Sequence, residues 1–159
     1  MKLTCRSEYA LLALVYLARQ EPSRFVSIEA IAAARDMPAK FLEQILLTLK
    51  RAKYLSSCRG QHGGYRLAKP ADKIALAEVI RLFDGALAPT DSVSRYFYGP
   101  TPVEREGALI RVFREIRDFV ASKLERTTIA DVARLNPNPR KGRRVLGTPD
   151  GGGGRKTYD

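Results

Sequence analysis

Two short segments of the chain carry the side chains best suited to bind nucleic acid. One segment holds Lys40, Glu43 and Gln44, and in the other Arg59 precedes the glycine-rich run Gly60-Gln61-His62-Gly63-Gly64. Arginine binds guanine or phosphate, glutamine pairs with adenine, and glutamate accepts a hydrogen bond from cytosine. The glycines leave no side chain to block a close approach of the backbone to a groove. These residue types point to recognition of a polyanion rather than to bond-making chemistry.

The other reactive residues do not form an enzyme or metal site. The sequence has one histidine, His62, and two cysteines, Cys5 and Cys58, which lack the paired spacing of metal ligands. No paired carboxylates, phosphate loop or nucleophile with its base can be recognised, which argues against an enzyme. Cys58 has two interpretations: Arg59 favours its thiolate and makes it redox-active, or it is a small apolar residue of a strand. His62 is expected to contact a groove or to be exposed, and Cys5 to be structural.

Positive charge is concentrated in the first part of the chain. The 159 residues carry a formal net charge of +11. Residues 1–73 contain 13 Lys and Arg against 6 Asp and Glu, residues 74–135 contain 9 of each, and residues 136–159 contain 6 against 2. A basic front beside a neutral middle predicts one face for a polyanion and another for protein or a small ligand. The longest apolar stretch, residues 10–18, is about half the length that spans a bilayer, so we expect a cytoplasmic protein without a membrane segment.

Helix and strand signals place residues 40–44 on a helix-turn-helix and residues 59–64 on a β-hairpin. Thr4 and Ser27 are N-cap candidates for helices over about 5–20 and 28–35, and Pro38 suits the first turn of a third helix that runs to about residue 53. Two short helices joined by a tight turn are typical of a helix-turn-helix. Residues 54–59 and 65–67 read as two strands around the glycine-rich tip. The predicted fold is mainly α with a small β-hairpin wing.

The second half of the chain predicts a long helix with an apolar stripe. After a short helix over 77–83, residues 86–102 contain three prolines and read as a loop. A long helix over 103–126 follows, and a short one over 129–134 begins at a capping box of Thr128 and Asp131. The stripe comprises Leu109, Val112, Phe113, Ile116, Phe119, Val120 and Leu124. We expect a second copy of the chain to bury it, with Leu109, Val112, Phe113, Ile116 and Val120 as the dimer contacts.

The predicted organisation therefore has four parts. They are a winged-helix DNA-binding domain over 1–85, a loop over 86–102, a dimerisation helix with a short terminal helix over 103–135, and a flexible basic tail over 136–159.

Six short motifs resemble the Rrf2 family of bacterial winged-helix regulators: Met1-Lys2-Leu3-Thr4, Tyr9-Ala10, Phe41-Leu42-Glu43-Gln44-Ile45, Leu55-Ser56-Ser57, Arg59-Gly60 and Gly63-Gly64-Tyr65. The resemblance covers about residues 1–135, and it implies a winged helix-turn-helix and a homodimer joined by the long helix. It also implies where double-stranded DNA is contacted: at Ala39, Lys40, Phe41, Glu43, Gln44, Arg59, Gly60, Gln61, His62, Gly63 and Gly64. Phe41 is expected to serve mainly as a core residue.

The chain departs from the cluster-binding members of that family. Those members place three cysteines in the loop before the long helix, whereas this chain carries residues such as Ser92, Tyr98 and Glu104 there. Iron–sulfur clusters are held chiefly by cysteine, so we expect no cluster and no other cofactor. The loop instead contains four residues that either line an effector pocket or pack beneath the dimer helix: Arg95, Tyr96, Phe97 and Tyr98.

Two functions follow from the sequence. The first is a homodimeric, sequence-specific DNA-binding transcriptional regulator, expected to be a repressor. The alternative is a protein-interaction regulator that acts mainly through a partner enzyme, with the basic front serving only solubility. An unknown small-molecule or protein effector fits both. Salt distinguishes the two, because binding to phosphates weakens steeply with ionic strength and binding to an apolar partner does not.

Overall fold

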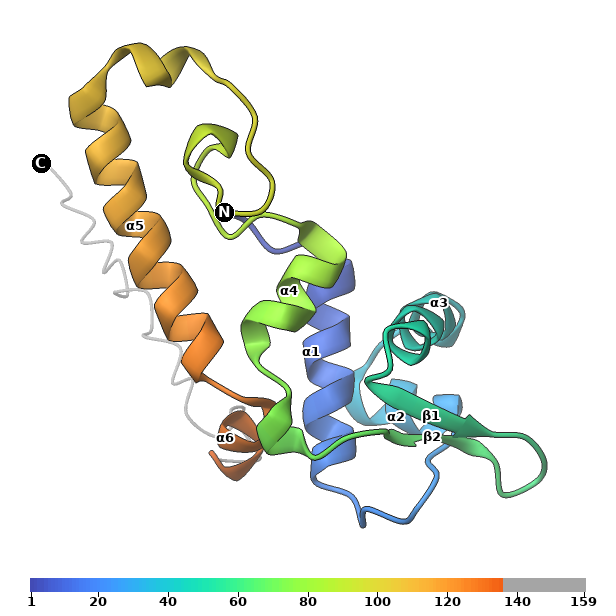
Figure 1. Cartoon of the computed structure of the whole chain (residues 1–159). Coiled ribbons are helices and arrows are strands. Elements are labelled where there is room, and N and C mark those ends of the chain that lie inside the picture. The colour runs from blue at the N-terminus through green and yellow to red at the C-terminus, as the bar shows by residue number, and fades with distance from the viewer. Residues whose placement is uncertain (136–159) are drawn as a thin grey trace, which may run out of the picture.

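The computed structural model describes residues 1–135, which form mainly helices and one small sheet (Figure 1). α1 (Cys5–Ala18) packs on one side against α2 (Ile28–Arg35), α3 (Ala39–Arg51) and the hairpin of β1 (Leu55–Cys58) and β2 (Gly64–Leu67). It also packs against α4 (Leu76–Asp84) and against α6 (Ile129–Arg134), which follows α5 (Gly107–Arg126). Three short 3-10 turns complete the described chain: η1 (Ala71–Lys73), η2 (Asp91–Val93) and η3 (Pro102–Arg105). The predicted flexible basic tail, residues 136–159, lies outside the described residues.

Polar caps begin the first two helices where the sequence predicts them. The hydroxyl of Thr4 accepts a hydrogen bond from the Ser7 amide at 3.4 Å, and that of Ser27 accepts one from the Ala30 amide at 3.2 Å. Asp36 ends α2 in the left-handed conformation, with φ of 54°, and the buried Met37 anchors the turn before α3. This is the predicted helix-turn-helix. Pro38 is the N-cap of α3 rather than part of its first turn, and α3 ends at Arg51, two residues before the left-handed Lys53.

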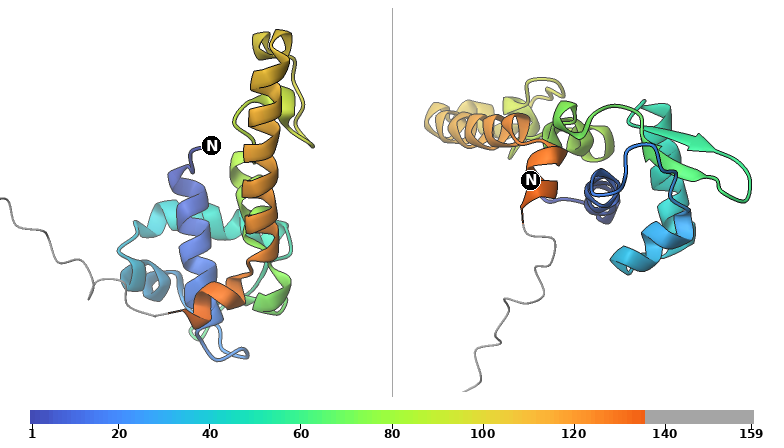
Figure 2. Two further views of the ribbon diagram at one scale, coloured as in Figure 1. Left: turned by 90° about the vertical axis from the view of Figure 1, so that its left-hand side faces the viewer. Right: turned by 90° about the horizontal axis from the view of Figure 1, so that it is seen from below.

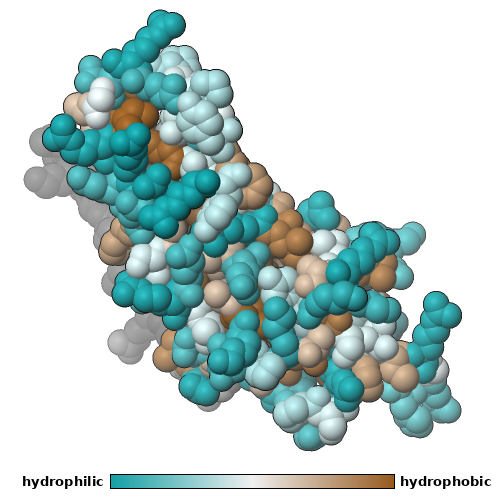
Figure 3. Space-filling model, viewed as in Figure 1, coloured by the Kyte–Doolittle hydropathy of each residue, from teal (hydrophilic) through white to brown (hydrophobic). Residues whose placement is uncertain are grey.

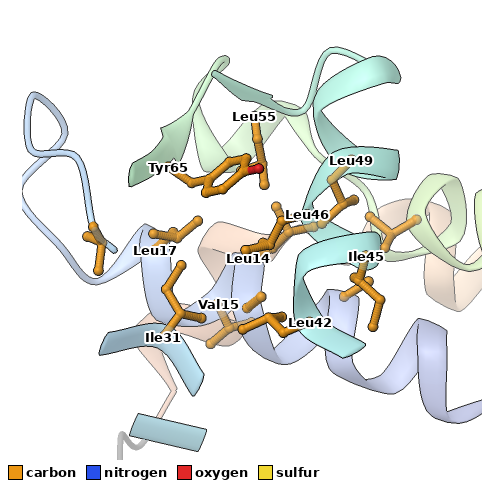
Figure 4. Packing of buried hydrophobic residues seen from close by; sticks show 14 of the residues in the cluster. Leu14, Val15, Leu17, Ile31, Leu42, Ile45, Leu46, Leu49, Leu55 and Tyr65 are labelled. Carbon is orange, nitrogen blue, oxygen red and sulfur yellow. The ribbon is translucent and has the colours of Figure 1, made fainter. Parts of the chain in front are cut away.

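The hydrophobic core lies between α1, α3 and the hairpin (Figure 4). Leu14 of α1 is fully buried, and Leu55 and Tyr65 cover the core from the hairpin. α3 contributes four fully buried side chains at the spacing of one helical face: Leu42, Ile45, Leu46 and Leu49. Because that face is committed to the core, the opposite face of α3 is left toward solvent.

Val26 joins the hairpin to the loop before α2 through a pair of backbone hydrogen bonds. The Val26 amide donates to the Tyr65 carbonyl at 2.8 Å, and the Tyr65 amide donates back to the Val26 carbonyl at 2.8 Å. Gly64 permits this approach, because its φ is +149° and a Cβ there would lie 2.1 Å from the Val26 oxygen. The base of the wing is therefore fixed against the helix-turn-helix.

The long helix starts later than the sequence predicts. Residues 102–105 form η3, and Glu106 then adopts an extended conformation and accepts a hydrogen bond from the Ala108 amide, so that α5 begins at Gly107. Pro102 suits the first position of such a short turn, and the side chain of Glu106 stabilises the new start. α5 extends past the rest of the described chain along one side (Figure 2). Its 20 residues correspond to about 30 Å.

α6 returns to the winged-helix unit rather than staying with α5. Ile129 is fully buried in the same core as Leu14, and its amide donates to the Ile74 carbonyl at 2.9 Å. The guanidinium of Arg19 donates to the carbonyl oxygens of Ala133 at 3.0 Å and Leu135 at 3.1 Å. The predicted capping box is also formed, since Thr128 and Asp131 exchange side-chain to backbone hydrogen bonds. The sequence grouped α6 with the long helix, whereas the structure makes it part of the first unit's core.

Candidate nucleic-acid interface

The exposed surface of α3 carries five of the eleven predicted DNA contacts. Lys40, Glu43 and Gln44 are exposed on the part of α3 that faces away from the core, and Ala39 is exposed at the start of the helix. Lys50 and Arg51 follow on the last turn and are exposed as well. Cationic and amide side chains thus project from one side of a helix whose other side is fixed in the core. This arrangement lets a helix enter the major groove without leaving the body of the protein.

Phe41 is placed differently from the prediction that it serves mainly as a core residue. Its side chain is 38% exposed and meets the ring of Tyr9 edge to face, with 5.7 Å between the ring centroids. Position 41 lies at the border between the buried and exposed faces of α3, where helical periodicity alone does not decide burial. The contact with α1 steadies the first turn of α3 and leaves part of the ring accessible.

The wing presents its tip to solvent. Arg59, Gly60, Gln61 and His62 are all exposed, and the tip closes where the Gly63 amide donates to the Gly60 carbonyl at 3.0 Å. Gly60 has a φ of +109°, a left-handed conformation that favours glycine. The tip therefore has one cation, one amide and one imidazole on a narrow backbone turn.

The wing and the helix-turn-helix enclose a hollow of about 440 Å³. Its walls come from the start of α2, the last turns of α3 and the wing, and they include Lys50, Arg59 and Cys58. Lys50 was not among the sequence-predicted contacts, although its place on the polar face of α3 was visible from helical spacing. The hollow brings Lys50 of α3 and Arg59 of the wing to one surface.

Arg66 and the two cysteines remain to be placed. Arg66 flanks the wing tip in the sequence, but its guanidinium donates to the Ser23 carbonyl at 3.2 Å and stacks on the Phe25 ring at 4.4 Å. It therefore faces the base of the wing. Cys58 is free and exposed, and its thiol donates to the Arg59 carbonyl at 3.4 Å, while Cys5 is also free and exposed instead of packing in the core.

The aromatic loop before α5 is held by arginines and leaves almost no space on the side that faces α5. Arg95 donates to the Asp118 carboxylate of α5 at 2.7 Å, and the guanidinium of Arg81 lies 4.9 Å from the Tyr96 ring centroid. The hydrogen bond from Arg117 is the main cause that lowers the pKa of Asp118. The cavity beside Tyr96 and Phe97 measures about 10 Å³, which is too small for an organic ligand. Tyr96, Phe97 and Tyr98 are exposed, and Phe97 also lines an open hollow of about 440 Å³ between the start of the chain and the end of α4.

A row of apolar side chains on α5 is left uncovered within the described chain. Leu109, Val112, Ile116 and Phe119 are 47%, 48%, 44% and 76% exposed, and Phe113 and Val120 flank them half-buried. The row follows alternating steps of three and four residues, which is the spacing of a coiled-coil seam. Apolar surface near the upper end of α5 is visible in Figure 3.

Comparison with known proteins identifies relatives along most of the chain. Residues 3–135 match the family model Rrf2, described as an iron-dependent transcriptional regulator. The HTH-type transcriptional regulator Rv1287 of Mycobacterium tuberculosis is 38% identical over 136 residues, covering 84% of this chain and 81% of the relative. The HTH-type transcriptional regulator CymR of Bacillus subtilis is 29% identical over 84% of this chain and 90% of its own length.

Solved structures of similar proteins share the fold. The structure of B. subtilis CymR, titled the global cysteine regulator, has a TM-score of 0.68 at 28% identity and covers 84% of this chain and 96% of its own. The oxidised form of Staphylococcus aureus CymR has a TM-score of 0.71 at 27% identity, covering 87% of this chain and all of that one. These likenesses confirm the winged-helix arrangement.

The family's description names iron, but the segment before α5 lacks the side chains that hold an iron–sulfur cluster. The segment between α4 and α5 contains no cysteine, and Tyr98 there donates to Glu104 at 2.7 Å while Thr101 donates to the buried Ser92 at 2.9 Å. Within residues 1–135 no three His, Cys, Asp or Glu side chains converge as metal ligands. This donor set does not fit an iron–sulfur cluster, which requires thiolates.

No helix within residues 1–135 is both long and apolar enough to cross a membrane. The match over residues 3–135, the relatives and the shared fold agree with one another, and the family is one of transcriptional regulators rather than enzymes. The chain belongs to the Rrf2 family of helix-turn-helix transcriptional regulators.

Proposed function

We propose that the chain is a homodimeric, sequence-specific DNA-binding repressor that works without an iron–sulfur cluster. The observation that carries the proposal is the outward face of α3, where Lys40, Glu43 and Gln44 are exposed beside a wing tip that holds Arg59. In this arrangement α3 enters the major groove and reads bases, while the wing lies over the backbone or the minor groove. A dimer seated across a promoter blocks access to it, which is why repression is the proposed outcome.

The proposed dimer is supported by the uncovered row on α5. Four apolar side chains, each more than 40% exposed, are costly to leave in water on a single helix. A second copy of α5 has the matching seam, because a two-fold axis brings identical rows together. The exposed aromatic side chains of the loop lie beside the same helix, and Arg95 anchors that loop to it.

The cluster-free mode of action is supported by what occupies the loop. The cluster-binding relatives resembled by this chain use cysteine there, and here hydroxyls and a tyrosine–glutamate pair link residues 90–104. The phenol of Tyr98 donates to Glu104, and this hydrogen bond raises the pKa of Tyr98. The loop is therefore closed by hydrogen bonds, and DNA binding is proposed to be insensitive to iron.

The test is a selection of duplexes from random-sequence DNA, followed by fluorescence anisotropy of the selected and a scrambled duplex over a range of salt. We expect one enriched motif with two half-sites, binding that weakens steeply with salt, and no change after iron chelation. Gln44→Ala should lower the ratio of specific to scrambled affinity by roughly tenfold, since a lost base contact costs about 1–3 kcal/mol. Arg59→Ala should reduce affinity and flatten the salt slope by about one ion if it binds phosphate.

Arg114→Ala, which removes an exposed cation on α5 away from the interface, is the matched control. A selection without enrichment, or equal losses in Arg59→Ala and Arg114→Ala, would contradict direct reading of DNA. That result would favour the alternative in which the chain regulates through a partner enzyme.

A further inference from the structure

A second and larger hollow lies at the base of the wing, between the end of α1, the loop that follows it and the connection from β2 to η1. Its volume is about 510 Å³, within the range of small-molecule sites. Leu17, Ala18 and Leu67 line it, and Pro22 and Pro70 stand on opposite sides. Leu17 is nearly fully buried and belongs to the core cluster that also contains Tyr65 (Figure 4). The hollow therefore has an apolar floor that continues into the core.

Cations dominate the walls of this hollow. Arg24, Arg66 and Lys69 contribute three positive charges, against the single carboxylate of Glu21. That carboxylate is engaged locally, because Glu21 accepts hydrogen bonds from the amide and hydroxyl of Ser23 at 3.4 and 2.9 Å. None of the ion pairs found in residues 1–135 involves these four charged residues. The walls thus present excess positive charge above an apolar floor.

Two of the cations are held in place before any ligand arrives. Arg66 is fixed by the Ser23 carbonyl and the Phe25 ring, and the ammonium of Lys69 lies 4.4 Å from the Tyr54 ring centroid. Arg24 is exposed at the mouth of the hollow. Preorganised cations lower the entropic cost of holding an anion, and the exposed arginine can close on it.

We infer that this hollow binds a small amphipathic carboxylate, with its apolar part on Leu17 and Leu67 and its carboxylate toward Arg24. Apolar surface and excess cationic charge complement an apolar chain that ends in an anion, and neither a neutral lipid-like molecule nor a bare polar anion uses both features. The site is distinct from the interface with DNA and from the aromatic loop before α5.

The hollow is placed to transmit its occupancy to the wing. Arg66 and Leu67 of β2 form one wall, and the adjacent Tyr65 carries the paired hydrogen bonds to Val26. A ligand seated between the loop and β2 changes the separation of the two segments that these bonds join. The resulting effect on DNA affinity rests on the proposed function, whereas the binding itself and the shift of the wing do not.

The test uses the full-length protein alone, with octanoate as the probe and octanamide as its neutral counterpart, followed by amide shifts in NMR spectra. Octanoate should bind saturably with Kd of about 1 mM or tighter, as expected for a ligand of this size, and should shift amides of residues 64–68. Octanamide should bind at least tenfold more weakly, because it lacks the charge that the cations attract.

Two variants locate the site. Arg24→Gln should weaken octanoate binding about tenfold, and Arg114→Gln, an equal loss of charge on α5, should leave it within about twofold. Ala68→Phe adds bulk at an exposed lining position and should abolish binding, while a dispersed spectrum confirms that the variant is folded. The inference is overturned if octanoate gives no saturable shift, if octanamide binds equally, or if Arg24→Gln and Arg114→Gln behave alike.

The same variants separate this inference from the proposed function. Octanoate binding by a protein that selects no DNA motif would support the site and contradict the regulator. If the unsubstituted protein does not bind octanoate and Arg24→Gln loses DNA affinity, Arg24 would instead be a phosphate contact. That result would overturn the ligand site.

Discussion

Replacing Gly64 by alanine tests whether the wing depends on its close approach to Val26. A Cβ at position 64 would lie 2.1 Å from the Val26 oxygen and 2.4 Å from its carbonyl carbon, both backbone atoms that cannot rotate away. The strand must therefore separate from residue 26, which breaks the two hydrogen bonds between Val26 and Tyr65. Alanine must also adopt a φ of +149° or shift the strand further.

The expected loss can be worked out from these contacts. Two broken backbone hydrogen bonds cost about 1–3 kcal/mol together, and the unfavourable φ adds about 1 kcal/mol or more. We therefore expect Gly64→Ala to lower the free energy of unfolding by about 3 kcal/mol. Gly60→Ala is the matched control, because Gly60 also has a positive φ but a Cβ there meets no atom within 4 Å. Its cost should be limited to backbone strain of about 1 kcal/mol.

Urea unfolding followed by circular dichroism measures both losses, at one protein concentration because association alters apparent stability. Amide exchange at Tyr65 should also become faster in Gly64→Ala and remain unchanged in Gly60→Ala, since only the first variant loses the bond to Val26. Equal losses in the two variants would refute the steric argument, and so would a Gly64→Ala protein with Tyr65 still protected.

Three further predictions concern the rest of the molecule. Ile116→Glu places a charge in the apolar row of α5 and should convert a dimer into a monomer in light scattering, with weaker DNA binding; an unchanged mass would argue against this seam. Ile129→Ala should cost about 2–4 kcal/mol in urea unfolding, because the side chain is fully buried where α6 meets the core, and a cost below about 1 kcal/mol would show that α6 is loosely docked. Burial opposes ionisation of Asp84, but hydrogen bonds from Ser7 and Thr4 outweigh it and lower the pKa of this carboxyl group. The ionised carboxylate therefore stabilises the fold at neutral pH, and this contribution is lost as the pH falls through the folded pKa. Asp84→Asn should therefore be destabilising at pH 7 and much less so at pH values below the folded pKa, and a penalty that does not change with pH would contradict this assignment.

The helix-turn-helix was predictable because its determinants are local. Ser27 begins α2 through its own hydroxyl, and the buried residues of α3 recur at the spacing of one helical face. The wing was predictable for the same reason, since its glycines and short strands lie within a few residues of one another. Most of the proposed DNA-contact set therefore occupies exposed positions, as the sequence suggested.

Features that depend on distant residues were not predictable. The pairing of Val26 with Tyr65 involves a single residue far from the hairpin and leaves no periodic pattern in the sequence. Arg66 follows the wing tip closely in the sequence, but its contacts with Phe25 and Ser23 hold its guanidinium at the base of the wing. The hollow at the base of the wing depends on how three separate segments are arranged, so no local sequence motif predicts it.

The docking of α6 has a consequence for the order in which the protein is completed during synthesis. Arg19 near the start of the chain binds the carbonyl oxygen of Leu135, and Ile129 fills the core formed by α1. Chains emerge from the ribosome beginning at the N-terminus, so α3 and the wing appear well before the residues that close their core. A nascent chain acquires its finished core only after α5 has been made. The helix-turn-helix and its wing thus reach full stability only when α5, the helix proposed to form the dimer, has already been synthesised.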